Sequence, residues 1–304
     1  MSARARRWVL LTFATLILLW SASGLVVDLL LTRRRTHFTE PLPAELVAAD
    51  PPCVELRLRA SDGLALGAWW IPARDARRAA LVLHGNDGSR TENAGLASML
   101  RDDGTSVLAL TLRAHGDSEG ERNDLGYSAR RDVLAALDEV ARRAPGLPIV
   151  VVGRSLGAAA ALYAAEEAKG RVDGWVLEAP YKDLESAVRA RLAMFLPAGF
   201  DRVAWATMRL SAPLVLEPPL DALAPIAHAT ALAGEPVLVL AGERDRHAPS
   251  PETREFATRI GASAEFVEFP GREHVQLARS DPERYLAAYR RLVARIDGSE
   301  RVRR

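Results

Sequence analysis

Short apolar runs alternate with longer amphipathic segments along most of this chain, and this alternation predicts a sheet flanked by helices. The apolar runs are rich in β-branched residues, which is typical of buried strands. We expect strands at residues 55–59, 64–71, 80–83, 106–110, 149–152, 174–178, 237–241 and 265–269. We expect helices near residues 91–102, 127–142, 156–169, 251–260 and 282–296.

The first two predicted strands are joined by Asp62-Gly63, a hairpin turn, and should pair antiparallel. Helices separate the later strands, which is the pattern of parallel βαβ units. The predicted fold class is therefore α/β, with a mostly parallel central sheet flanked by helices.

An insertion at about residues 181–235 interrupts this alternation. It predicts a helical cap whose apolar face lines a lipophilic pocket, although the same residues would also suit the cores of ordinary helices. Its large apolar residues are Met194, Phe195, Leu196, Phe200, Trp205, Met208 and Leu210.

The N-terminal stretch from Trp8 to Leu31 is apolar except for Asp28. As a helix it would be about 36 Å long, which is enough to cross a hydrocarbon core of about 30 Å. We expect a single-pass anchor in the cell membrane, because the apolar run continues beyond the small residues at Ser21–Ser23. The alternative is a signal peptide cleaved near Ser23, followed by secretion. Arginines flank both ends of the stretch, so the orientation in the membrane stays open.

Four parts follow from this organisation. Residues 1–35 form the anchor with basic flanks, and the proline-punctuated residues 36–53 form a linker. Residues 54–298 form the α/β domain, with the cap inside it. Residues 299–304 form a basic C-terminal tail.

Composition narrows the functional classes. The 304 residues are 49% hydrophobic and 26% charged, with a net charge of +1, so nothing favours nucleic acid as a partner. The single cysteine, Cys53, excludes an internal disulfide. We expect neither a cofactor nor a metal, and the oligomeric state stays undefined.

The sequence Gly153-Arg154-Ser155-Leu156-Gly157 joins a buried strand to an alanine-rich helix. This G-x-S-x-G pattern is typical of a nucleophile elbow, in which a sharp strained turn exposes the serine hydroxyl. The two glycines would leave room for that turn. Ser155 is therefore the candidate nucleophile.

The carboxyl ends of parallel strands meet at one edge of a sheet, so loops that follow other strands should lie near Ser155. The loop that begins His84-Gly85-Asn86 should present the Asn86 N–H, which together with the Leu156 N–H would make an oxyanion hole. Asp245 and His274 follow the last two strands, and would supply an acid and a base in the chain order Ser, Asp, His.

Other acids compete with Asp245, and other histidines with His274. Glu178 ends the strand after the elbow and is the alternative acid, whereas Glu243 should face away from the site. We prefer His274 as the base because it alone lies between the last strand and the final helix. His37, His84, His115, His228 and His247 occupy the linker, glycine turns, the insertion or a position too near Asp245.

Four patches resemble the α/β-hydrolase superfamily of serine hydrolases, in particular its membrane-anchored α/β-hydrolase-domain branch, related to serine aminopeptidase and prolyl oligopeptidase catalytic domains. The resemblance spans residues 54–296 and implies the α/β-hydrolase fold. It also implies that the loop from Arg113 to Gly120 shapes the pocket floor, although relatives often have glycine where this chain has Ala114. The patches are residues 84–86, 113–120 and 153–157 and the pair Asp245 and His274.

The resemblance implies a serine hydrolase that cleaves carboxylic ester, thioester or amide bonds through an acyl-enzyme. Ser155 would attack, His274 would act as base and Asp245 would orient it, with oxyanion donors on Asn86 and Leu156. The anchor and the apolar cap favour a lipophilic or acylated small-molecule substrate. An aminopeptidase or oligopeptidase with the same triad is the alternative, and a non-catalytic membrane-anchored binding protein is a third.

Overall fold

The computed structural model describes residues 2–34, 38–274 and 276–303. Within them, eight strands form one sheet in the order β1-β2-β4-β3-β5-β6-β7-β8. The β1–β2 pair is antiparallel and the neighbours from β4 to β8 are parallel, as the sequence predicts, and β2 also pairs antiparallel with β4. The strands are β1 (Val54–Arg59), β2 (Ala65–Ile71), β3 (Arg78–Leu83), β4 (Thr105–Leu110), β5 (Ile149–Arg154), β6 (Gly174–Glu178), β7 (Val237–Gly242) and β8 (Ala264–Phe269).

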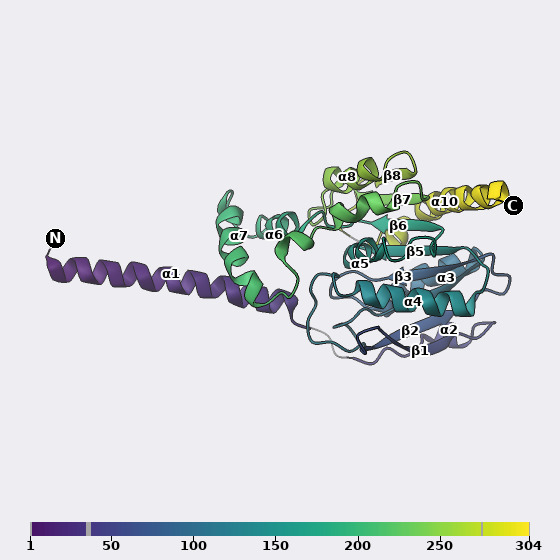
Figure 1. Cartoon of the computed structure of the whole chain (residues 1–304), viewed down its shortest axis with the longest axis horizontal. Coiled ribbons are helices and arrows are strands. Elements are labelled where there is room, and N and C mark those ends of the chain that lie inside the picture. The colour runs from purple at the N-terminus through teal and green to yellow at the C-terminus, as the bar shows by residue number, and fades with distance from the viewer. Residues whose placement is uncertain (1, 35–37, 275, 304) are drawn as a thin grey trace.

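Helices cover both faces of the sheet (Figure 1). Apolar residues of α4 (Arg130–Arg143), α5 (Leu156–Ala164) and α8 (Ser250–Ile260) pack in one core with one face of the strands. Those of α3 (Ala94–Asp102) and α10 (Pro282–Arg303) pack on the other face. The remaining short helices are α2 (Ala44–Val47), α9 (Leu277–Ser280), η1 (Arg90–Asn93), η2 (Ala212–Leu214), η3 (Leu220–Ala222) and η4 (Pro225–Leu232).

The strand register brings the loops of the candidate site to one edge of the sheet. Leu83 of β3 pairs with Gly153 of β5, and Arg154 of β5 pairs with Glu178 of β6. Gly242 of β7 pairs with Phe269 of β8. Since these parallel strands end level with their neighbours, the loops that follow them lie together, which is where α/β proteins bind ligands.

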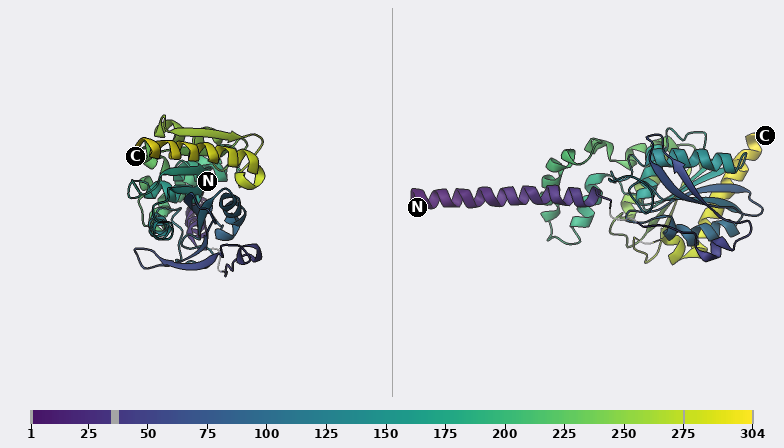
Figure 2. Two further views of the ribbon diagram at one scale, coloured as in Figure 1. Left: turned by 90° about the vertical axis from the view of Figure 1, so that its right-hand side faces the viewer. Right: turned by 90° about the horizontal axis from the view of Figure 1, so that it is seen from below.

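The predicted cap region contains α6 (Leu184–Leu192) and α7 (Phe200–Ser211), which pack together through their own apolar cluster. The N-terminal helix α1 (Ala3–Thr32) is longer than the predicted residues 8–31. Among the described helices it alone is long and apolar enough to cross a membrane. Most of α1 runs clear of the domain, and only its C-terminal end lies beside α7 (Figures 1 and 2).

The described part of the predicted linker, residues 38–53, packs against the domain. Residues 44–47 form α2, and Leu46 is buried in the core beside α3. Glu40 is also buried, because its carboxylate is paired with the Arg90 guanidinium at 3.2 Å. The proline pattern therefore marked the absence of long regular structure and not the absence of packing.

Two helix boundaries also differ from the predictions. The helix expected over residues 156–169 ends at Ala164, and the chain continues in turns to Gly170, whose φ is +74°. The predicted tail is helical instead, because α10 continues through Arg303.

The buried ion pair of Arg90 supplies a stability test. Arg90→Ala would leave the Glu40 carboxylate buried without its cation, and such a loss typically costs about 3–5 kcal/mol. Arg90 also binds Asp117 at 2.6 Å, so the variant loses both pairs. The control is Arg74→Ala, because Arg74 and its partner Asp50 are both exposed and such pairs contribute about 0–1 kcal/mol. Thermal unfolding of the full chain in detergent, followed by circular dichroism, should show a large loss of stability for Arg90→Ala only; equal losses would contradict the assignment.

Candidate active site

Ser155 occupies a sharp turn between β5 and α5. Its backbone has φ 48° and ψ −107°, a conformation that costs energy for a residue with a side chain. A Cβ at Gly153 would lie 2.6 Å from the Gly157 carbonyl oxygen, and one at Gly157 would lie 2.7 Å from the His84 carbonyl oxygen. The predicted steric role of the two glycines is therefore confirmed.

Three of the predicted site residues lie in hydrogen-bond contact. The Ser155 Oγ is 3.2 Å from Nε2 of His274, and Nδ1 of the same imidazole is 2.7 Å from Oδ2 of Asp245. The Asp245 side chain is fully buried, while the His274 side chain is 18% exposed. Residues from three separate loops thus form one line from carboxylate through imidazole to hydroxyl.

Backbone donors fix the orientation of the Asp245 carboxylate. Its Oδ1 accepts hydrogen bonds from the N–H groups of His247 and Ala248, each at 2.8 Å. Its Oδ2 is thereby left for the imidazole. The sequence disfavours His247 as the base because it is too near Asp245 along the chain. The ring of His247 nevertheless lies beside that of His274, with 5.0 Å between the ring centroids. Burial, and secondarily the neighbouring His274, lower the pKa of His247, which disfavours a second cation beside the imidazole.

The loop after β3 is held by its own histidine. The Leu112 N–H donates to Nε2 of His84 at 3.0 Å, and Nδ1 of that ring lies 2.7 Å from the Gly85 carbonyl oxygen. Burial lowers the pKa of His84 well below its usual value, so the ring is neutral and can donate at one nitrogen while it accepts at the other. His84 therefore fastens the predicted oxyanion loop to the end of β4.

Asn86 and Leu156, the predicted oxyanion donors, both line the cavity that contains Ser155. Leu156 is the first residue of α5, so its N–H belongs to the free N-terminal donors of that helix. The Asn86 side chain accepts a hydrogen bond from Asn123 Nδ2 at 2.7 Å. Asn123 follows the loop of residues 113–120, and no motif in its local sequence predicts this contact.

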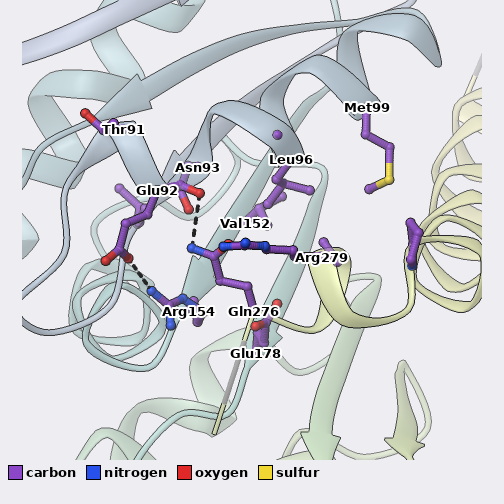
Figure 3. Close-up of a pocket in the computed structure, with 14 residues that line it drawn as sticks. Thr91, Glu92, Asn93, Leu96, Met99, Val152, Arg154, Glu178, Gln276 and Arg279 are labelled. Atoms are coloured by element: carbon purple, nitrogen blue, oxygen red, sulfur yellow. Dashed lines mark hydrogen bonds and ion pairs between the residues drawn. The ribbon is translucent and has the colours of Figure 1, made fainter. Parts of the chain in front are cut away.

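Glu178, the alternative acid, makes different contacts. Its Oε1 accepts the Leu277 N–H at 3.1 Å, and burial raises the pKa of its carboxyl to about 7. It lines a cavity of about 700 Å³, of which Ser155 is not a lining residue (Figure 3). In the same cavity Glu92 forms an ion pair with Arg154 at 2.6 Å. Glu178 thus lines a different cavity from the one that Ser155 lines.

Glu243 accepts the Gly271 N–H at 2.6 Å through its side chain, on the exposed side of the loop. Among the described residues, no group of three or more histidine, cysteine, aspartate or glutamate side chains is arranged to hold a metal ion.

The cavity beside Ser155 is narrow, about 70 Å³, and its walls are mainly apolar. The cap contributes Trp205 and Met208, as predicted, but Phe195, Phe200 and Leu210 are exposed, so that part of the prediction is wrong. The resemblance implied that residues 113–120 form the pocket floor, but none of them is among the residues that line this cavity.

Instead, the loop of residues 113–120 is held at its first residue by two ion pairs. Arg113 forms ion pairs with Asp132 at 2.6 Å and with Asp62 at 2.7 Å. Ala114, where relatives often have glycine, has φ 59°. The tight turn is therefore retained with alanine in the left-handed region.

Comparisons with known proteins agree with this geometry. Residues 74–221 match the family model described as serine aminopeptidase, S33. An uncharacterized protein of Mycobacterium tuberculosis is 28% identical over 270 residues, which cover 86% of this chain and 85% of the relative. Human monoglyceride lipase is 34% identical over 114 residues, covering 37% of this chain and 38% of the lipase.

The solved structures include an esterase of Pyrococcus furiosus with a TM-score of 0.67 and 20% identity, which covers 86% of this chain and 98% of the esterase. This likeness extends over the fold described above, and two of the named relatives are a lipase and an esterase. The chain therefore has the α/β-hydrolase fold, and its sequence is similar to the serine aminopeptidase family over residues 74–221.

Proposed function

We propose that this protein is a serine hydrolase that cleaves an ester of a lipophilic acyl group through a covalent acyl-enzyme. The observation that carries the proposal is the contact chain from Asp245 through His274 to Ser155. A serine hydroxyl is a weak nucleophile until a neighbouring base takes its proton. The Nε2 atom of His274, at 3.2 Å from the hydroxyl, is positioned to do so.

The mechanism follows from the positions of these groups. Ser155 Oγ attacks the carbonyl carbon while its proton passes to Nε2 of His274. The Asp245 carboxylate holds the other nitrogen and stabilises the imidazolium. His274 then gives the proton to the leaving oxygen, and water activated by the same imidazole releases the acyl group. The N–H groups of Asn86 and Leu156 would bind the oxyanion of each tetrahedral intermediate.

The cavity walls support an acyl substrate over a free peptide terminus. Leu184, Trp205 and Met208 line it, and the Asp28 carboxylate within it already accepts a hydrogen bond from the Ser211 hydroxyl at 2.6 Å. An aminopeptidase would require acidic groups free to bind a substrate ammonium. The description of the matching family model nevertheless makes a peptidase the second candidate.

We also propose that α1 remains attached as a membrane anchor. Trp20 donates from Nε1 to the Thr207 hydroxyl at 2.6 Å, and Gly24 lies against the same part of α7. A Cβ at Gly24 would be 3.0 Å from Thr207 Cγ2, so the two helices approach closely. Cleavage near Ser23 would divide this packed interface, which supports the uncut helix.

The nucleophile is tested by labelling with a fluorophosphonate probe, which reacts with activated serines. The full chain in detergent should be labelled, and both Ser155→Ala and His274→Ala should abolish labelling. A panel of fatty-acyl and aminoacyl coumarin substrates should show hydrolysis of the fatty-acyl members. Labelling that survives in Ser155→Ala, or exclusive hydrolysis of aminoacyl substrates, would contradict the proposal.

The choice of acid is tested by a matched pair of variants. Asp245→Asn should reduce turnover by about 10⁴, because the imidazole would take the wrong tautomer. Glu178→Gln should keep near-normal turnover, since the Glu178 side chain accepts the Leu277 N–H and only its backbone carbonyl contacts Ser155. The reverse result would make Glu178 the acid.

Glu178→Gln should instead change how stability depends on pH. Burial raises the pKa of Glu178 above its unfolded value of 4.5, so the folded chain holds this proton more tightly than the unfolded chain. The stability of the wild type relative to the variant should fall as pH rises from about 4.5 to about 7, and then level off. A difference in melting temperature that does not vary with pH would show that this carboxyl titrates normally.

The anchor is tested by the fate of the N-terminus in cells. A C-terminally tagged chain should stay with the membranes after an alkaline carbonate wash, and its intact mass should include residues 2–23. A soluble product beginning near Gly24 would contradict the anchor and favour a cleaved signal peptide.

A further inference from the structure

The last turns of α1 are built into the cap. The Ser211 hydroxyl of α7 donates to the buried Asp28 carboxylate at 2.6 Å. Val27 and Leu31 pack against the apolar cluster that α6 and α7 form. The Asn123 N–H donates to the Thr32 carbonyl oxygen at 2.7 Å, so the helix end is also tied to the loop that holds Asn86.

This end of α1 also borders the candidate nucleophile. Asp28, Leu31 and Thr32 line the same cavity as Ser155. The same cavity is also lined by apolar side chains of the cap, among them Trp205, Met208 and Leu216. The helix α1 is therefore continuous from its apolar N-terminal part, which could cross a membrane, to the cavity that Ser155 lines.

We propose that the C-terminal end of α1 is a wall of the acyl-binding pocket, and that it selects the length of the acyl chain. This inference rests on the proposed function and names its substrate class, an ester of a long unbranched fatty acid. An acyl chain that leaves the bilayer along α1 would stay in contact with apolar side chains until its ester group reaches Ser155.

The dimensions of the cavity define how a long chain enters. About 70 Å³ is roughly the volume of two water molecules, far less than a fatty acyl chain requires. The pocket must therefore widen where α1 meets α7, the seam held by the Asp28–Ser211 and Trp20–Thr207 hydrogen bonds. Phe200, Val203 and Leu210 lie exposed on α7, the helix beside the C-terminal end of α1 (Figure 1).

The test uses full-length protein in detergent with p-nitrophenyl acetate and p-nitrophenyl palmitate. Leu31→Trp would fill the pocket, and should lower the palmitate-to-acetate ratio of kcat/KM by at least about tenfold, since a misfit of a few methylenes in an apolar pocket costs that much. Leu31→Ala should raise the ratio by removing bulk. The matched control is Leu29→Trp on the exposed side of the same helix, which should leave the ratio unchanged.

The outcomes separate this inference from the function on which it rests. A wild type that hydrolyses acetate, with the same ratio in both Leu31 variants, overturns the pocket wall alone. An equal change in Leu29→Trp also overturns it, because any bulk on α1 would then have the effect. A folded wild type that hydrolyses neither ester overturns the proposed function, and this inference with it.

Discussion

The strained backbone of Ser155 is the constraint on which the rest of this structure depends. A φ of 48° and a ψ of −107° are held because Gly153 and Gly157 let strand, helix and the His84 loop approach within distances that no side chain would allow. The turn aims the hydroxyl at His274 and places the start of α5 behind it. The parallel strands on either side of β5 end at the same edge of the sheet, so the loops that follow them lie near Ser155.

The two acids near this turn, Asp245 and Glu178, differ in environment, and that difference supports the roles proposed for them. Asp245 is buried, and its carboxylate receives two backbone N–H groups and contacts an imidazole nitrogen. Glu178 is buried with one backbone donor, and its raised pKa reflects that poorer solvation. Two acids at the ends of neighbouring strands thus have different chemistry, because only one lies in line with the imidazole.

Much of the fold and of the candidate site could be predicted from local sequence. Buried β-branched runs located the strands, and the elbow and the order Ser155, Asp245, His274 located the loops that meet. Contacts between distant segments could not be predicted, because no local pattern records them. Glu40 lies in the predicted linker, and no local pattern predicts its ion pair with Arg90. Asn123 belongs to no motif, so its hydrogen bond to Asn86 could not be predicted either. The exposed positions in the cap were missed because apolar composition alone does not tell which face of a helix is buried.

The central claim is that Ser155 is an acylated nucleophile in a pocket shared by the cap and α1. The most direct measurement is a crystal structure of the full chain after reaction with a long-chain alkyl fluorophosphonate. The account predicts a phosphorus bonded to Ser155 Oγ, a phosphonyl oxygen about 2.7–3.1 Å from the N–H groups of Asn86 and Leu156, and an alkyl chain against Leu31. An adduct on another residue, or a phosphonyl oxygen that no backbone N–H reaches, would contradict it.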